Sequence, residues 1–369
     1  MDNFDCLTIC KKTMTRHLFY LLLIVLANPA FARDNHLRLK LYKANNPKIQ
    51  YVGRVDFSDP QKPKFWSPGV YIKFKFKGPA FDLIINDEAD GNNHNYVEIA
   101  IDDNPLLRIK LEGKVNDHKI AYGLADTEHT VTICKDTESG IGYMEFVGIR
   151  CEKLLPPPPQ PTRKIEYIGD SITAGTGMDV SQIACDAGQW YDQHNAYMSY
   201  GALTSRGLNT QWQLTAVAGI GLTQSCCNMD IVMPEVLDKT ILRDNKIAWD
   251  FNRYQPDVVT ICLGQNDGII DSTKFCNAYV QFIGDVRKHY PTADIICLTS
   301  PMANDELSAV LKRYLSGITT YMNNNGDKKV YKYFFSKRFH NGCGGHPDME
   351  EHVQIANELT IYIKKVEGW

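Results

Sequence analysis

A serine lies in a glycine-flanked turn, Gly169-Asp170-Ser171-Ile172-Thr173-Ala174-Gly175, directly after the β-rich run 164–168. A turn of this kind at the end of a buried strand holds the serine hydroxyl clear of the backbone and open to a substrate carbonyl. An anion-binding turn is one alternative, because free N–H groups at a helix start attract phosphate. The segment has neither the Gly-Lys-Ser/Thr ending of a P-loop nor the third glycine of a dinucleotide fingerprint. We therefore interpret Ser171 as a candidate nucleophile, with a purely structural turn as the remaining alternative.

Three further segments contain the other groups that acyl transfer needs. Each lies where a strand is expected to end or a helix to begin: Gly219-Ile220-Gly221-Leu222-Thr223 after the run 212–219, Gly264-Gln265-Asn266-Asp267-Gly268 after the run 258–263, and Gly344-Gly345-His346-Pro347 before the last helix. We expect Ser171 to attack a carbonyl and His346 to accept its proton and return it to the leaving alcohol. The N–H groups of Ser171 and Gly221 and the amide of Asn266 would bind the oxyanion, with Gly219 as the alternative to Gly221. Each such donor is typically worth about 10²–10³ in turnover.

In order, spacing and strand-end context, these four segments resemble the blocks of the SGNH, or GDSL-type, esterase superfamily over residues 163–369. The resemblance implies a doubly wound, three-layer α/β/α (flavodoxin-like) domain with its site at the carboxyl ends of the strands. Periodicity agrees, because it predicts strands at 293–299 and 328–335 and helices over 273–289, 306–324 and 349–366. The superfamily includes lipases, thioesterases, arylesterases and carbohydrate deacetylases, so it does not by itself give a substrate.

The last block departs from the superfamily pattern at Cys343, where an aspartate usually orients the histidine. Either a backbone carbonyl orients His346, which would give a Ser171–His346 dyad, or an acid comes from elsewhere in the chain. Asp348 begins Asp348-Met349-Glu350-Glu351, which has the pattern of a capping box at the start of the last helix. We therefore expect Asp348 to be structural. His340 lacks the Gly-Gly-His-Pro setting and is interpreted as a surface or cleft-rim histidine.

The segment 1–32 has the features of a signal peptide. Its charged residues precede an apolar run, 18–27, and an A-x-A cleavage site: Lys11, Lys12 and Arg16, then Ala30-Phe31-Ala32. We expect the segment to be removed, leaving a secreted or periplasmic protein that is not bound to a membrane. A membrane anchor is the alternative, although the apolar run is short for a span.

The remaining chain is predicted to form two domains. Strict alternation in 71–77, 96–101 and 129–133, with turn residues between these runs, predicts antiparallel sheet with one solvated face. We therefore expect a β-sandwich, jelly-roll-like domain over 33–155. The proline-rich segment 156–163 is interpreted as a stiff linker to the SGNH hydrolase catalytic domain at 164–369.

Composition is that of ordinary globular protein, with 369 residues, of which 44% are hydrophobic and 22% charged. A formal net charge of −3 argues against nucleic acid as a partner. No zinc-ligand spacing is present, and we expect neither a cofactor nor a metal to be needed.

The cysteines indicate both disulfides and free thiols. Eleven cysteines, less Cys6 and Cys10 of the leader, leave nine in the mature chain, and an odd number requires at least one free thiol unless chains cross-link. Cys262 and Cys297 lie in apolar strand runs and are expected to be core thiols. Candidate pairs in an oxidising compartment are Cys134 with Cys151, and Cys185 with Cys226 or Cys227.

A jelly-roll-like domain directly before an SGNH domain resembles carbohydrate esterase family 2. Supporting segments occur in both halves of the chain: Phe65-Trp66-Ser67-Pro68-Gly69, Asp102-Asp103-Asn104, Gly123-Leu124 followed by His129, and Asn195-Ala196-Tyr197-Met198-Ser199-Tyr200-Gly201. The family includes enzymes whose catalytic histidine lacks the usual aspartate, which agrees with Cys343. The resemblance implies an acetylated polysaccharide or oligosaccharide as substrate, with the acetyl groups of xylan or the 6-O position of hexoses in glucomannan as candidates.

Two aromatic residues, Trp190 and Tyr191, lie in a long insertion after the nucleophile, where a flat ring can stack on a sugar. Core packing is the alternative for each of them. Two other functions stay open for the whole chain: a lipid esterase of the arylesterase or lysophospholipase type, and a glycan-binding pseudoenzyme.

Overall fold

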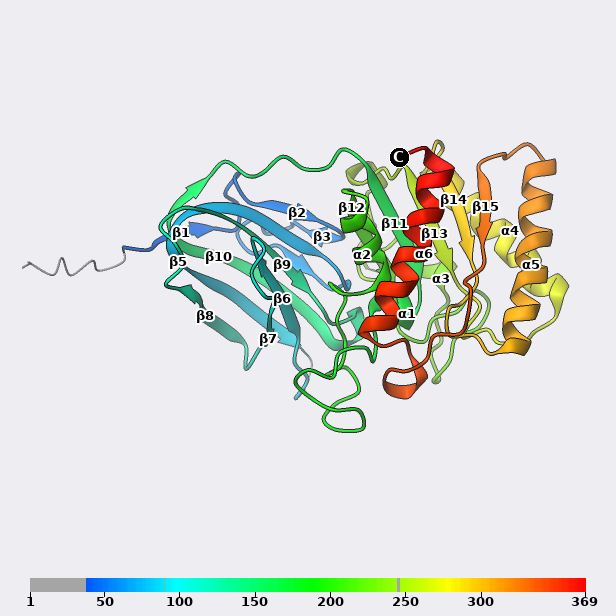
Figure 1. Cartoon of the computed structure of the whole chain (residues 1–369), viewed down its shortest axis with the longest axis horizontal. Coiled ribbons are helices and arrows are strands. Elements are labelled where there is room, and N and C mark those ends of the chain that lie inside the picture. The colour runs from blue at the N-terminus through cyan, green and yellow to red at the C-terminus, as the bar shows by residue number, and fades with distance from the viewer. Residues whose placement is uncertain (1–37, 90, 244–245) are drawn as a thin grey trace, which may run out of the picture. The chain divides into compact units, whose positions relative to one another are not determined.

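The computed structural model describes residues 38–89, 91–243 and 246–369, which belong to one compact unit (Figure 1). The predicted signal peptide, 1–32, lies outside the described residues. Within those described ranges, no helix combines the length and apolar character needed to cross a membrane.

The first part of the described chain is an antiparallel sheet. Its strands are β1 (Lys40–Lys43), β2 (Gln50–Val52), β3 (Val55–Asp56), β4 (Lys64–Phe65), β5 (Tyr71–Ala89), β6 (Tyr96–Ile101), β7 (Leu107–Lys110), β8 (Val115–Tyr122), β9 (Glu128–Lys135) and β10 (Gly142–Leu155). The main order is β3-β4-β10-β5-β9-β6-β7, with β1 paired to β10 and with β2 and β8 paired to β5. The sandwich-type domain is thus confirmed, and one hydrogen-bonded sheet builds it.

The alternation in β5 explains how this sheet encloses a core. Ile72, Phe74 and Phe76 are buried, whereas the lysines between them lie toward solvent. The first half of β5 pairs with β9 and the second half, after Gly78, pairs with β8. Because one long strand takes part in both halves, the sheet curls around a single apolar cluster.

The second sheet is parallel and has the order β12-β11-β13-β14-β15. These strands are β11 (Lys164–Gly169), β12 (Gln211–Ala216), β13 (Val258–Cys262), β14 (Asp294–Leu298) and β15 (Val330–Tyr333). The helices are α1 (Ser171–Ala174), α2 (Tyr200–Gly207), α3 (Met233–Val236), α4 (Ser272–His289), α5 (Asp305–Asn324) and α6 (Met349–Glu367), with 3₁₀ turns η1 (Ser139–Ile141), η2 (Phe251–Arg253) and η3 (Cys343–Gly345). This is the flavodoxin-like order that the resemblance implied.

Helices cover both faces of the parallel sheet. On β11, Ile165 and Tyr167 pack in one cluster with α2 and α6, and Ile168 packs in another with α4 and α5. Figure 1 shows α2 and α6 beside each other. Since β11 lies between β12 and β13, the chain reverses direction across the sheet at this point, and ligands of open parallel sheets bind at such switch points.

Residues 156–163 join the two sheets and belong to no helix or strand. The domain limits of 33–155 and 164–369 remain predictions.

Candidate active site

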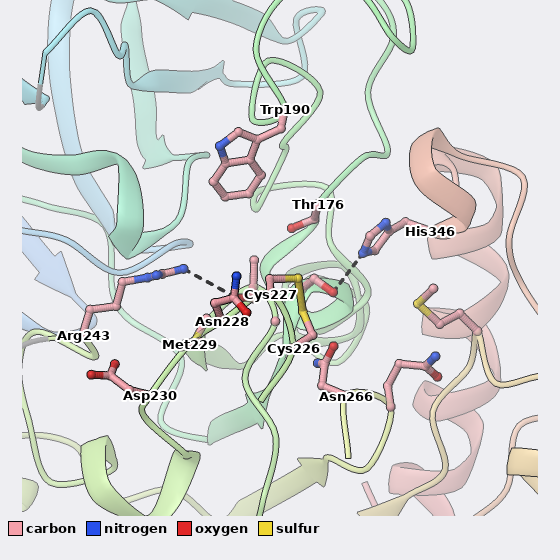
Figure 2. Close-up of a pocket in the computed structure, with 15 residues that line it drawn as sticks. Thr176, Trp190, Cys226, Cys227, Asn228, Met229, Asp230, Arg243, Asn266 and His346 are labelled. Atoms are coloured by element: carbon pink, nitrogen blue, oxygen red, sulfur yellow. Dashed lines mark hydrogen bonds between the residues drawn. A yellow bond between two sulfur atoms is a disulfide. The ribbon is translucent and has the colours of Figure 1, made fainter. Parts of the chain in front are cut away.

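Ser171 and His346, 175 residues apart in the chain, form a hydrogen bond with 2.9 Å between Ser171 Oγ and His346 Nε2 (Figure 2). The serine is the first residue of α1, and only Asp170 separates it from the last residue of β11. The Asp170 side chain caps this helix by accepting the Ile172 N–H at 3.0 Å. A Cβ at Gly169 would lie 2.1 Å from Thr173 Oγ1, so only glycine permits this tight strand-to-helix turn.

A backbone carbonyl orients the histidine. His346 Nδ1 lies 3.1 Å from the carbonyl oxygen of Cys343. A carbonyl can only accept, so Nδ1 carries the proton and Nε2 is free to accept from Ser171. Burial lowers the pKa of His346, and the carbonyl partly offsets this, so the neutral base form prevails at neutral pH. Asp348 accepts the Glu351 N–H at 2.8 Å and caps α6, and His340 is exposed.

The structure places Gly221 away from the cavity beside Ser171. Its N–H donates to Ser225 Oγ at 3.0 Å. A Cβ at this residue would lie 1.9 Å from the Gln224 carbonyl, so close packing within its own loop explains the glycine. Gly219 lines the cavity with a left-handed φ of +85°. We therefore move the proposed oxyanion N–H to Gly219.

Asn266 follows β13 and lines the same cavity. Its Nδ2 donates to the Ile220 carbonyl at 2.8 Å and makes a longer contact, 3.3 Å, with Asp170 Oδ2. The first contact fixes the side chain. The hydrogen directed at Asp170 is the more weakly held of the two and is the one we propose for an oxyanion.

Two buried carboxylates hold these loops, and sequence reasoning gave neither of them a role. Asp267 accepts the N–H groups of Leu222 and Thr223 at 2.8 and 2.7 Å, which ties the loop after β12 to the loop after β13. Burial raises the pKa of Asp170 to about 7, and the charge of Asp267 adds to this effect, while the Ile172 N–H opposes it. An aspartate at each strand end was the only signal that the sequence offered.

A cavity of ≈ 590 Å³ opens over the serine and the histidine. Trp190 lines it and is 53% exposed, with its edge packed on His194 at 4.9 Å between ring centroids. Tyr191 does not line it. That ring is 1% exposed, and its hydroxyl accepts the His94 N–H at 3.1 Å. Of these two aromatic residues, Trp190 alone lines the cavity, where Figure 2 shows its ring.

Arg243 also lines the cavity, a feature that the sequence did not indicate. Its guanidinium pairs with the fully buried Glu138 at 3.2 Å. The same carboxylate accepts the Ala218 N–H at 3.3 Å, one residue before Gly219. The segment between β9 and β10 therefore supports the loop that we assign to the oxyanion. Among the described side chains, no group of three or more His, Cys, Asp or Glu is arranged to hold a metal ion.

The cysteine pairs differ from those expected. Disulfides join Cys185 to Cys343 and Cys226 to its neighbour Cys227, while Cys134 and Cys151 are separate buried thiols. The last two lie on β9 and β10, which do not pair with each other. The free-thiol prediction is confirmed, because the core cysteines on β13 and β14 are buried and unpaired.

Comparison with known proteins agrees with this geometry. The model of the carbohydrate esterase 2 N-terminal domain matches residues 51–158, and that of the GDSL-like lipase/acylhydrolase family matches residues 167–327. The cellulase/esterase CelE of Acetivibrio thermocellus is 34% identical over 337 residues, which are 88% of this chain, and the match spans 40% of CelE. An acetylxylan esterase/glucomannan deacetylase of Cellvibrio japonicus is 27% identical over 88% of this chain and 91% of its own length.

Among solved structures, a family two carbohydrate esterase from Clostridium thermocellum in complex with cellohexaose is 33% identical, with a TM-score of 0.79. The match covers 87% of this chain and 99% of that one. Similarity of this extent spans most of this chain and nearly all of the solved one. The chain therefore belongs to carbohydrate esterase family 2, whose catalytic half has the SGNH hydrolase fold.

Proposed function

We propose that this protein is a secreted serine esterase that removes O-acetyl groups from polysaccharides through an acyl-enzyme. The observation that carries this proposal is the 2.9 Å contact between Ser171 Oγ and His346 Nε2 at the floor of an open cavity. A hydroxyl in contact with a neutral, oriented imidazole is the arrangement of an activated nucleophile.

In the first half of the reaction, His346 takes the Ser171 proton as Oγ attacks the acetyl carbonyl. The oxyanion is bound by the N–H groups of Ser171 and Gly219 and by the Asn266 amide. The first of these is free of an intrahelical acceptor because Ser171 begins α1. The imidazolium then protonates the leaving sugar hydroxyl. In the second half, His346 activates water, which releases acetate.

The substrate proposal rests on the cavity and on the relatives. Trp190 offers an exposed ring at the cavity edge, where it can stack on a pyranose face. One relative is named for acetylxylan and glucomannan, and the Clostridium structure was solved with cellohexaose. We propose that this chain acts on acetylated xylan, glucomannan or a related polymer.

The test is a panel of esters compared at equal enzyme concentration. We expect release of acetate from acetylated glucomannan or xylan. We also expect faster cleavage of an aryl acetate than of the matching butyrate or octanoate, because we propose that Gly219 and Asn266 wall a site that takes only the acetyl group. Addition of a chelator should leave the rates unchanged, since the proposed oxyanion site uses N–H groups. Better turnover of octanoate, or activity lost with chelator and restored by a divalent metal, would contradict the proposal.

Secretion is tested separately. The protein recovered from the culture medium or periplasm should begin at Arg33 if the segment 1–32 is a cleaved signal peptide. Retention of that segment in a membrane fraction would favour an anchor.

A further inference from the structure

Position 343, where the SGNH pattern has an aspartate, carries two structural roles in this chain. The carbonyl of Cys343 accepts from His346 Nδ1 at 3.1 Å and from the His346 N–H at 3.2 Å. Its side chain forms the disulfide to Cys185. The backbone that orients the catalytic histidine is therefore covalently tied to a residue 158 positions earlier in the chain.

The turn that carries this carbonyl is intrinsically loose. Cys343 is flanked by Gly342, Gly344 and Gly345, and the last two have left-handed φ values of +62° and +74°. Glycine loses more conformational freedom on ordering than any other residue, so such a turn is poorly fixed by its own sequence. Within the turn, the Gly342 N–H donates to the His346 carbonyl at 2.7 Å. Outside it, the Cys343 N–H donates to the Gly177 carbonyl at 2.8 Å.

The other end of the disulfide is a firm anchor. Gln193, which is 3% exposed, donates from Nε2 to the carbonyls of Ala184 and Ala187 at 2.9 and 3.1 Å, on either side of Cys185. The Gln193 carbonyl in turn accepts the Met178 N–H at 3.0 Å. The disulfide thus links a glycine-rich turn to a loop that its own hydrogen bonds already hold.

We propose that the Cys185–Cys343 disulfide is a positioning element for His346: it holds the Cys343 carbonyl beneath Nδ1 and so replaces the orienting aspartate of the superfamily. The inference rests on the proposed function, because it concerns the proton transfer between His346 and Ser171. Cys343 acts through the imidazole and does not touch substrate. The disulfide should therefore govern kcat and leave the KM for polysaccharide, which depends on Trp190, nearly unchanged.

The experiment compares the C185S/C343S and C185S/C343D variants with wild type and with the control Cys276→Ser, which changes a free cysteine on α4 away from the cavity. We expect C185S/C343S to lose about ten-fold in kcat on an aryl acetate, the rate equivalent of one hydrogen bond. In C185S/C343D, a carboxylate at position 343 should recover kcat. It should also move the acidic limb of kcat/KM to higher pH, because a nearby negative charge raises the pKa of an imidazole.

Each outcome decides the question. A C185S/C343S enzyme with wild-type kcat, or a C185S/C343D enzyme with neither recovered kcat nor a shifted limb, would overturn the positioning role. Absence of ester hydrolysis by wild type would instead contradict the proposed function, so the two failures are distinct.

A second measurement covers the case in which the double variants do not fold. Wild-type enzyme is partly reduced, which the exposure of Cys185 permits, and the freed thiols are alkylated with iodoacetamide. Peptide mass spectrometry then gives the fraction of molecules in which the Cys185–Cys343 bond is open. Activity should fall in proportion to opening of the Cys185–Cys343 bond. Full activity with that bond opened would overturn the proposal.

Discussion

Gly177 follows the nucleophile helix and faces the turn that orients His346. Its φ is +70°, and a Cβ added there would lie 2.7 Å from the carbonyl oxygen of Cys343. The replacement Gly177→Ala therefore presses directly on the atom that accepts the His346 Nδ1 proton.

The size of the effect follows from these contacts. A carbon and an oxygen in weak contact are about 3.3 Å apart, so the Cys343 carbonyl must move by roughly 0.6 Å. The Nδ1 to oxygen distance is already 3.1 Å, and a separation near 3.6 Å is no longer a hydrogen bond. We expect kcat to fall about 10- to 100-fold, through loss of this bond and misplacement of the imidazole. The left-handed φ adds a stability cost of about 1–2 kcal/mol.

The assay is aryl acetate hydrolysis, with thermal unfolding measured on the same samples. Gly113→Ala is the matched control, because Gly113 has a φ of +67° and nothing within 4 Å of its added Cβ. The control should lose similar stability and keep the wild-type kcat. Equal kcat in Gly177→Ala and Gly113→Ala would refute the assignment of the Cys343 carbonyl as the group that orients His346.

Three further predictions concern charge and substrate contact. Because burial lowers the pKa of His346, the acidic limb of kcat/KM should lie below pH 6.5, which a pH–rate profile checks. The pKa of Asp170 is raised from 3.8 to about 7, so its stabilising contribution is present below pH 3.8 and lost as pH rises through 7. Asp170→Asn should therefore gain stability relative to wild type between pH 4 and about 8 in denaturant titrations. It should also lose kcat, because its new amide N–H₂ group would face Asn266 Nδ2, which is also a donor, and displace it. Trp190→Ala should raise KM for acetylated polysaccharide more than for an aryl acetate, which has no sugar to stack.

Much of the fold could be predicted because its signals are local. The period of two in β5, β6 and β9, and the period of 3.6 in α4 and α6, agree with the observed elements to within a few residues at most ends. Ser171 and Asn266 each follow a predicted strand in a glycine-containing segment, which indicated that the two residues meet at one edge of the sheet. The superfamily resemblance then implied the strand order.

The details that the sequence could not supply depend on contacts between distant segments. Whether Gly219 or Gly221 offers a free N–H is decided by the hydroxyl of Ser225, four residues beyond Gly221, and no spacing rule expresses this. Tyr191 is buried because the β6 region covers it, while its neighbour Trp190 stays open. Cysteine pairing could not be chosen because it requires knowing that the turn at Cys343 returns to the loop between α1 and α2, which carries Cys185.

The central claim is that Ser171 and His346 act as one proton-transfer unit in deacetylation. It is tested most directly by the rate of acetate release from acetylated glucomannan or xylan by wild type, Ser171→Ala, His346→Ala and the double variant, with His340→Ala as the control. The account predicts losses of several powers of ten in each single variant, little further loss in the double variant, and a near wild-type rate for the exposed His340. More than about a tenth of wild-type turnover in Ser171→Ala, or a larger loss in His340→Ala than in His346→Ala, would contradict it.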